Sequence, residues 1–389
     1  MEKNIQTSVS TSPAFKKKTL LFTSLLVSFL LTLPLAAWAA TPWYSQGETH
    51  ILTLTPDGKV WVMGDNEFGQ LGNGAFEGEA LEPTIISGLD AVIATSTGGN
   101  HSVALKKDGT VWTWGLNRTG QLGNGTTENA AIPLKVSGLS EVTAIATGGA
   151  HVVALKKDGT VWVWGGNQSG QLGTGDQQDR LTPTRLQGLE NVTAIAAGVY
   201  NTSVLKSDGT VWSWGFNGSG QLGIGSSKRS RTPVQVSGLG DVTAITAGNW
   251  HVVALKRDGT VWAWGNNDAG QLGVTKLTYS FSPLQVEGLG DVADITASIG
   301  QTIAITRDNR VLAWGNARSN VASDIGSRSP VPVSGYNGPV MVAAVVNPDT
   351  LNVQKINPDS SSLLADAGTS KGIATQFNDY EDSLQTHFY

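Results

Sequence analysis

The stretch that decides the fold is residues 151–186, which read HVVALKKDGTVWVWGGNQSGQLGTGDQQDRLTPTRL. Near-copies of it stand on both sides at intervals of about 50 residues. Each copy keeps, with a few substitutions, a histidine, an Asp-Gly pair, Trp-x-Trp-Gly, Gly-Gln-Leu-Gly and a closing proline in the same order. Self-similarity at this period is typical of repeat proteins, in which each unit is one small supersecondary structure.

One unit predicts four short β-strands. Apolar runs and alternating residues predict strands at 142–146, 152–155, 161–164 and 184–186, which we term A, B, C and D. Asp158-Gly159 predicts a two-residue hairpin turn between B and C, with positive φ at both positions. A proline precedes strand D, and its missing amide hydrogen favours D as the outer edge of the unit.

The number of units predicts a β-propeller, because four-stranded antiparallel units in tandem form propeller blades. Dividing the chain after residue 39 by the period gives seven units. We therefore expect an all-β fold, a seven-bladed β-propeller over 40–368 with six clear blades and a degenerate seventh, followed by a tail at 369–389. The stretch from 335 to 368 lacks Trp-x-Trp-Gly and Gly-Gln-Leu-Gly, so six blades plus a C-terminal appendage is the alternative.

The N-terminus has the layout of a secretory signal peptide at 1–39. Basic residues at 16–18 precede an apolar run at 20–35 and then Ala37-Trp38-Ala39. Small residues at these positions suit a signal peptidase, so we expect cleavage after Ala39. The prediction is a secreted or periplasmic protein that is not inserted in the membrane after cleavage.

Composition limits the chemistry that this chain can carry. Cysteine is absent, which excludes disulfides and thiolate metal sites. Removal of residues 1–39 leaves 22 basic and 30 acidic residues and a net charge of −8, which gives no general attraction to nucleic acid. No paired-acid, triad or metal-ligand spacing is present, so we expect no catalytic residues, no metal and no cofactor. We expect a monomer whose partner is another protein.

The ordered set of Gly-x-x-His, Asp-Gly, Trp-Gly and Gly-Gln-Leu-Gly recurs through six units between residue 41 and about 335. This pattern resembles the regulator of chromosome condensation repeat family, here as a secreted, bacterial-type member. The resemblance implies a seven-bladed propeller. It also implies two functional precedents, guanine-nucleotide exchange on a small GTPase and inhibitors that cap an enzyme with one propeller face. It does not fix the function, because one scaffold hosts many functions.

The repeated histidines and tryptophans are interpreted as structural. Residues 50 apart lie on different blades, and Asn201 and Gln301 replace two histidines, which a metal ring would not tolerate. We expect each histidine to tie one blade to its neighbour by a hydrogen bond. Met63 and Leu312 replace two tryptophans, which indicates a need for bulk and thus packing between blades. The residues so assigned are His101, His151, His251, Trp114, Trp164, Trp214 and Trp264.

Strand order separates two faces of the ring. The A-to-B and C-to-D loops open on one side, the loop face, and the B-to-C turns and D-to-A links open on the other, the turn face. The turn face is near-uniform, whereas the loop face varies between units, as binding surfaces of repeat proteins do. The alternative is neutral variation of loops. The predicted partner-binding residues are Tyr200, Trp250, Phe216, Leu116, Asn100, Arg229, Tyr279 and Phe281.

These observations favour a secreted protein-binding scaffold, either inhibitor-like or an adaptor, that uses the loop face. Exposed aromatic residues on a rigid frame are typical of protein-binding hot spots. Two alternatives stay open. One is a regulator of the nucleotide-exchange type, by family analogy, and the other is a glycan-binding propeller.

Overall fold

The computed structural model of the protein describes residues 43–47, 49–315 and 327–332. Within these residues there are twenty-four β-strands and no helix. None of the described residues therefore belongs to a helix long and apolar enough to cross a membrane. The predicted signal peptide at 1–39, the predicted seventh unit at 335–368 and the tail at 369–389 lie outside the described residues.

The strands form six antiparallel sheets, each with its four strands paired in chain order. The A strands are β1 (Trp43–Gln46), β5 (Val92–Thr97), β9 (Val142–Thr147), β13 (Val192–Ala197), β17 (Val242–Ala247) and β21 (Val292–Ser298). The B strands are β2 (His50–Leu54), β6 (His101–Lys106), β10 (His151–Lys156), β14 (Asn201–Lys206), β18 (His251–Lys256) and β22 (Gln301–Thr306). The C strands are β3 (Val60–Asp65), β7 (Val111–Gly115), β11 (Val161–Gly165), β15 (Val211–Gly215), β19 (Val261–Asn266) and β23 (Val311–Gly315). The D strands are β4 (Glu79–Ile85), β8 (Ala130–Lys135), β12 (Arg180–Arg185), β16 (Ser230–Gln235), β20 (Tyr279–Gln285) and β24 (Val331–Pro332).

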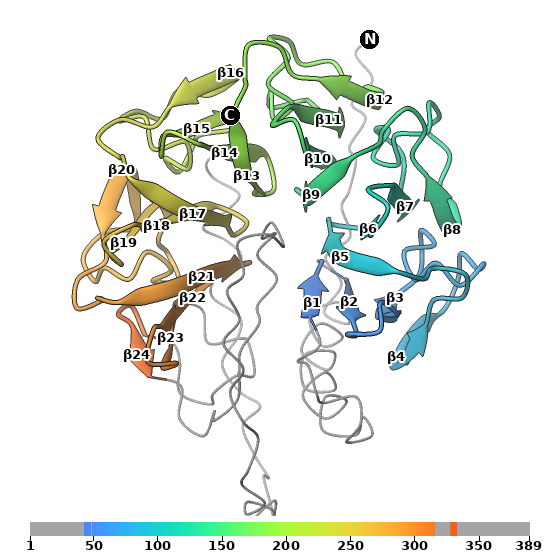
Figure 1. Cartoon of the computed structure of the whole chain (residues 1–389), viewed down its shortest axis with the longest axis horizontal. Coiled ribbons are helices and arrows are strands. Elements are labelled where there is room, and N and C mark those ends of the chain that lie inside the picture. Colours follow the sequence, from blue (N-terminus) through green and yellow to red (C-terminus); the bar gives the residue numbers. More distant parts are fainter. Residues whose placement is uncertain (1–42, 48, 316–326, 333–389) are drawn as a thin grey trace, which may run out of the picture. The chain divides into compact units, whose positions relative to one another are not determined.

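The six sheets are the blades of a six-bladed β-propeller, numbered here 1 to 6 in chain order. Figure 1 shows them arranged about a common axis, with the A strands innermost and the D strands outermost. The prediction of seven blades is wrong, because the described residues form six. That prediction divided chain length by the period. The residues that join one blade to the next occur in six units only. Counting these residues therefore gives the number of blades more reliably than dividing the chain length by the period.

The turn between strands B and C also differs from the prediction. In blade 3 the Gly159 amide donates to the Lys156 carbonyl, and Gly159 alone has positive φ, at 77°. The loop is a type I turn closed by a left-handed glycine, a three-residue hairpin connection. The Asp158 carboxylate accepts hydrogen bonds from the Thr160 amide (3.0 Å) and hydroxyl (2.6 Å), which holds Asp158 in place. Asn309 takes the glycine position in blade 6 with φ 62°.

Strand D begins earlier than its proline predicts. In blade 3, β12 starts at Arg180 and contains Pro183, next to an irregularity in its pairing with β11. Because β12 is the outer edge of its sheet, a residue without an amide hydrogen costs no ladder bond on the open side.

The hydrophobic core is divided among the seams between blades. At the seam between blades 3 and 4, Val163 and Leu172 of one blade pack with Ile195 and Trp214 of the next. The second tryptophan of each Trp-x-Trp-Gly is fully buried in such a seam. Burying an aromatic side chain of this size contributes about 2 to 3 kcal/mol each, so stability resides largely in blade-to-blade contact.

Candidate functional site

Each of the five seams from 1/2 to 5/6, which the described residues form, is joined by a tryptophan and a glutamine of the repeat. The Trp114 indole Nε1 donates to the backbone carbonyl of Gln70 at 2.9 Å, and the Trp214 indole donates to the backbone carbonyl of Gln171 at 2.8 Å. Blades 3, 5 and 6 repeat the contact through Trp164, Trp264 and Trp314. The structure thus gives Gly-Gln-Leu-Gly a structural role, because the backbone carbonyl of its glutamine accepts a hydrogen bond from the indole of the following blade.

Three histidines extend this contact through a hydroxyl. His151 Nε2 lies 3.0 Å from the Thr202 hydroxyl, which donates its hydrogen to the Gln171 carbonyl at 2.8 Å. A hydroxyl has one hydrogen, so here it must accept from the histidine, and Nε2 carries the proton. The same arrangement joins His50 to Ser102 and His251 to Thr302.

Among these five seams, the hydroxyl link is present at alternate ones. Seams 1/2, 3/4 and 5/6 have Ser102, Thr202 and Thr302. Seams 2/3 and 4/5 have Val152 and Val252 at the equivalent position, and both valines are fully buried. At seam 2/3 both ring nitrogens of His101 are buried without a hydrogen-bond partner among the described residues. At seam 4/5 the side-chain amide of Asn201 is likewise buried, and neither its nitrogen nor its oxygen has a partner among these residues.

Burial keeps these histidines neutral. It lowers the pKa of His50, His151 and His251 to about 3, and that of His101 to about 4. A group that resists protonation to this extent and contacts only the protein interior serves packing and hydrogen bonding rather than proton transfer at neutral pH.

The glycine three residues before each histidine is needed for space. A Cβ atom at Gly98 would lie 2.0 Å from His101 Cε1, and one at Gly148 would lie 2.1 Å from His151 Cε1. The Cε1–Nδ1 edge of the histidine ring therefore packs against the glycine, which explains Gly-x-x-His as a steric pair.

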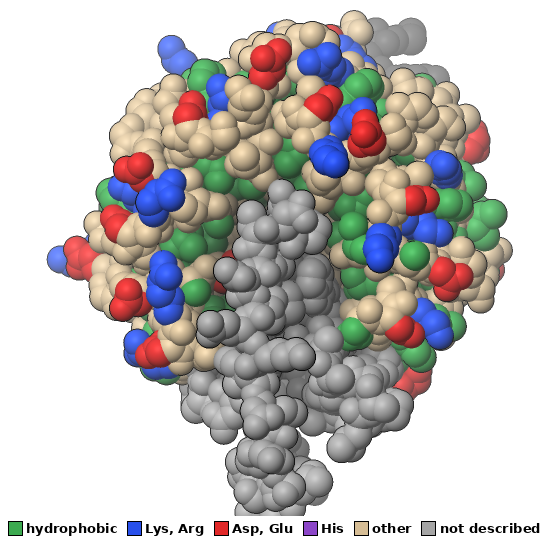
Figure 2. All heavy atoms as spheres, in the orientation of Figure 1, with side chains coloured by type: hydrophobic (Ala, Val, Ile, Leu, Met, Phe, Trp, Pro, Cys, Tyr) green, Lys and Arg blue, Asp and Glu red, His purple; other side chains and the backbone are tan. Residues whose placement is uncertain are grey.

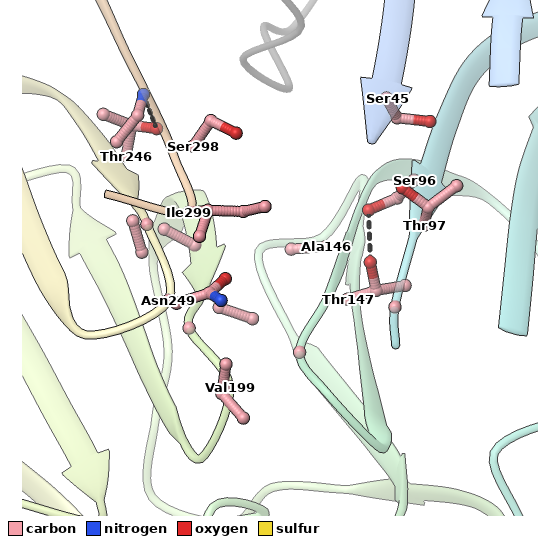
Figure 3. A pocket seen from close by; sticks show the side chains of 18 of the residues that line it. Ser45, Ser96, Thr97, Ala146, Thr147, Val199, Thr246, Asn249, Ser298 and Ile299 are labelled. Carbon is pink, nitrogen blue, oxygen red and sulfur yellow. Dashed lines mark hydrogen bonds between the residues drawn. The ribbon is translucent and has the colours of Figure 1, made fainter. Parts of the chain in front are cut away.

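The central channel opens on the loop face, where the ends of the A strands and the A-to-B loops line it. Its lining is composed of small, hydroxyl and aliphatic residues with one asparagine and one glutamine, and has no charged side chain among the described residues. Figure 3 shows the Ser96 and Thr147 hydroxyls bonded to each other at 2.7 Å across seam 2/3, and Thr246 bonded to a backbone amide of blade 6. Sequence reasoning missed these hydroxyls, although one stands at or near the end of every A strand except β13 of blade 4.

Backbone hydrogen bonds run from blade to blade around the channel mouth. The Gly99 amide donates to the Gly149 carbonyl, Gly149 to Val199, Val199 to Asn249, and Asn249 to Ile299, at 3.0 to 3.3 Å. The side chains on this ring differ in size. Blades 2 and 3 place glycine at the mouth, whereas blades 4, 5 and 6 place the larger residues Val199, Asn249 and Ile299 there. The loop face is thus rigid in backbone and uneven in relief.

Three of the predicted binding residues form one aromatic cluster on blades 4 and 5. The Trp250 ring lies 5.7 Å from the Tyr200 ring and 5.8 Å from the Phe216 ring, between centroids, with the Phe216 contact edge-to-face. Tyr200 is 39% exposed, and the other two are half-buried. The backbone supports the cluster, because the Phe216 amide donates to the Tyr200 carbonyl. We call Tyr200, Phe216 and Trp250 the aromatic cluster.

The other predicted binding residues lie apart from one another. On blade 2, Leu116 and Asn100 are half-buried, and the Asn100 side chain accepts from the Thr49 hydroxyl of blade 1 at 3.0 Å. Arg229 is exposed on the C-to-D loop of blade 4. Tyr279 is 49% exposed, and its ring contacts that of Phe281 at 4.9 Å between centroids, with the two planes tilted by 48°.

Phe281 has a packing role of its own. A Cβ atom at Gly220 would lie 2.7 Å from Phe281 Cδ1, so Phe281 covers the first glycine of the Gly-Gln-Leu-Gly of blade 4.

The turn face is regular and mixed in charge. On blade 2, the Trp112 indole donates to the Thr110 hydroxyl at 3.2 Å, and Lys106 Nζ lies 5.1 Å from the ring centroid. The Thr110 hydroxyl in turn holds the pKa of Asp108 below its ordinary value. Blades 3, 4 and 5 repeat the lysine-over-tryptophan contact.

Figure 2 shows one face of the molecule, on which Lys and Arg side chains alternate with Asp and Glu and no large area of one sign forms. No described histidine is visible there, in keeping with histidine burial in the seams. Among the described residues no group of three or more histidines and carboxylates is placed to hold a metal ion.

Six four-stranded blades, joined through repeated tryptophan and glutamine contacts around a channel, define a repeat-built β-propeller. A family model described as the RCC1-like domain matches residues 43–245. Models of the regulator of chromosome condensation (RCC1) repeat match 242–271 and 258–305. Since the first match covers more than half of the chain, the protein belongs to the family of regulator of chromosome condensation repeat proteins.

Similar proteins match over short stretches. The "Protein RCC2 homolog" of Danio rerio is 43% identical over 86 residues, which are 21% of this chain and 17% of that protein. The "Regulator of chromosome condensation" of Homo sapiens is 37% identical over 92 residues, 24% of this chain and 22% of that protein. The matched stretches thus span less than a quarter of these relatives.

Solved structures match over most of the propeller. Human WBSCR16 has a TM-score of 0.67 with 25% identity, and the match covers 76% of this chain and 83% of that chain. Prp20p from Saccharomyces cerevisiae, whose structure was described with its binding to Gsp1p and histones, has a TM-score of 0.66 with 24% identity. That match covers 75% of this chain and 76% of the yeast chain, and it shows the fold alone.

Proposed function

We propose that this protein is an exported binding propeller that holds another protein on its loop face, as an inhibitor-like or adaptor module and not as a catalyst. The aromatic cluster is the observation that carries the proposal. Tyr200, Phe216 and Trp250 stand on a backbone fixed by blade-to-blade hydrogen bonds, so little conformational entropy is lost when they are buried by a partner. Rigid aromatic anchors of this kind dominate the energy of protein interfaces.

Export is the second part of the proposal and rests on the predicted signal peptide at 1–39. It directs the search for a partner to the cell surface, the periplasm or the medium. Detection of the chain with Ala40 as its first residue in an exported fraction of the producing cell would support this part. An intact N-terminus in the cytoplasmic fraction would refute it.

The test of the binding site compares three forms of the full chain. The first is the unchanged chain and the second has Tyr200, Phe216 and Trp250 replaced by alanine. The third is a matched control with Leu81, Ile85 and Ile132 replaced by alanine, three exposed apolar residues on outer strands β4 and β8.

Each form is used to capture proteins from the exported fraction, and the affinity for each identified partner is then measured by calorimetry. A partner retained by the unchanged and control forms and lost by the cluster variant supports the proposal. Equal binding by all three forms refutes it, provided that thermal unfolding shows the cluster variant folded.

A second candidate is nucleotide exchange on a small GTPase, which the family membership favours. It predicts faster release of a fluorescent guanine nucleotide from a GTPase when the chain is added. No acceleration at a saturating concentration of the chain would eliminate this candidate.

A further inference from the structure

We propose that the aromatic cluster and the basic loops beside it form one surface for an acidic polypeptide segment that carries an apolar or aromatic side chain. This inference rests on the proposed function and names the chemistry of the partner. It follows from how charge is distributed among the C-to-D loops of the loop face.

Basic residues lie in the loops that adjoin the cluster. The C-to-D loop of blade 4 carries Lys228 and Arg229, and that of blade 5 carries Lys276, all exposed. Within the described part of the chain, the structure pairs none of the three with a carboxylate in an ion pair. Their charge is therefore available to a partner.

Backbone and side-chain hydrogen bonds connect these loops to the aromatic residues. In blade 4 the residue after Phe216 is Asn217, whose side chain donates to the Lys228 carbonyl at 2.9 Å. In blade 5 the Asn266 amide donates to the Trp250 carbonyl at 2.9 Å, and the Asn267 side chain donates to the Leu277 carbonyl at 2.7 Å. The basic loops are thus held beside the cluster by the same asparagine that shapes every C-to-D loop.

Carboxylates gather on other blades or are engaged. The C-to-D loop of blade 1 is acidic, with Glu67 and Glu77, and in that of blade 2 Glu128 is balanced in charge by Arg118. On blade 3, Asp176 pairs with Arg180 at 2.7 Å. On blade 5, Asp268 accepts from the Asn266 side chain at 2.8 Å and is the one acidic residue of that C-to-D loop. The C-to-D loops therefore change sign between blade 1, which is acidic, and blade 4, which is basic and carries Tyr200 and Phe216 of the aromatic cluster.

Charge and apolar surface together identify the partner. An apolar side chain fits beside Tyr200 and Trp250, and carboxylates next to it meet the basic loops and speed association. The described residues that line the channel mouth are neutral, so they offer no ion pair to a charged side chain. Nucleic acid is the competing occupant, but the excess of acidic residues over the whole chain opposes it.

The experiment selects displayed random peptides on the full chain and measures the affinity of the selected peptides by fluorescence polarisation. One variant carries Lys228→Glu, Arg229→Glu and Lys276→Glu. The matched control carries Lys107→Glu, Lys157→Glu and Arg257→Glu, the same charge change at exposed positions on the turn face. Thermal unfolding checks that both variants fold.

We expect selected peptides to be rich in Asp or Glu next to Phe, Trp or Leu, and to lose binding when the aromatic cluster is replaced by alanine. Reversal of the three loop charges should weaken them by at least about tenfold, and the control should change affinity by less than about twofold. Higher salt should weaken the binding in the same direction.

Three results would overturn the inference. Peptides that need the cluster but are neutral or basic would refute the acidic partner and leave the proposed binding face standing. Equal weakening by both charge variants would show general attraction. Displacement by single-stranded oligothymidylate would assign the basic loops to nucleic acid. If no selected peptide depends on the cluster, the proposed binding face falls as well.

Discussion

Val152→Thr should stabilise the propeller by completing the hydroxyl link that seam 2/3 lacks. Val152 holds the position that Thr202 holds one blade later, and both pair with the buried tryptophan of strand C. The new hydroxyl would accept from His101 Nε2 and donate to the Gln121 carbonyl, which already receives the Trp164 indole and has a second lone pair. Threonine and valine have the same shape, so the substitution adds a hydrogen bond without adding volume.

The expected gain is about 1 to 2 kcal/mol, because a buried nitrogen without a partner acquires one. For a domain of this size each kcal/mol raises the melting temperature by about 2 to 4 °C. Urea and thermal unfolding measure the gain, and a His101 Nε2 proton that becomes protected from exchange reports the bond itself.

A second variant tests the cause of the gain. In a His101→Phe background the hydroxyl has lost its donor, so Val152→Thr should bring no gain. An equal gain with and without His101, or a loss in the wild-type background, would refute the proposed link.

Three further predictions concern the seams and turns. Thr202→Val should lower the free energy of unfolding in urea by about 1 to 3 kcal/mol, since it leaves the His151 Nε2 proton without an acceptor. An unchanged midpoint would contradict the link between His151 and Thr202. The buried histidines have a lower pKa in the folded than in the unfolded chain, so stability is constant above about pH 7 and falls as pH drops below about 6.5, by roughly 2 kcal/mol per histidine at pH 5. His251→Gln should remove one proton from that dependence, and equal slopes for both forms would argue against it. Ala91 has a positive φ of 56°, a conformation that strains alanine and that asparagine tolerates better, and it occupies the position that Asn191 occupies in blade 4. Ala91→Asn should therefore raise the unfolding free energy by about 0.5 to 1 kcal/mol, and a lower unfolding free energy would disprove strain at Ala91.

The sequence predicts much of the scaffold because each repeat repeats its physical constraints. The positions of strands A, B and C and the left-handed Asn309 agree with the structure, whereas strand D begins earlier than predicted. The turn type was wrong because Asp-Gly fits two hairpin geometries. The choice between them depends on Thr160, whose amide and hydroxyl engage the Asp158 carboxylate.

The number of blades was wrong because chain length was counted instead of seam-forming residues. The alternation of seams was also visible in the sequence, as a hydroxyl at 102, 202 and 302 and valine at 152 and 252. The hydrogen bond that this alternation controls could not be predicted, since nothing within one repeat indicates that this side chain faces the histidine of the preceding blade. That contact depends on the rotation between blades.

For the binding surface, the sequence identified the variable loop face and the aromatic residues on it. The structure adds that the Trp250 ring contacts both Tyr200 and Phe216, while Tyr279 contacts Phe281 instead. Side-chain contacts between loops of different blades require three-dimensional placement, which periodicity does not supply.

The alternation of seams makes the physical unit of this propeller a pair of blades. Blades 1 and 2, 3 and 4, and 5 and 6 are each joined by a histidine and a hydroxyl, whereas the 4/5 seam closes without that link. The Tyr200 and Trp250 rings bridge that same seam from above. A protein that binds both aromatic rings would therefore connect two blade pairs, so binding should also make the propeller harder to open between blades 4 and 5.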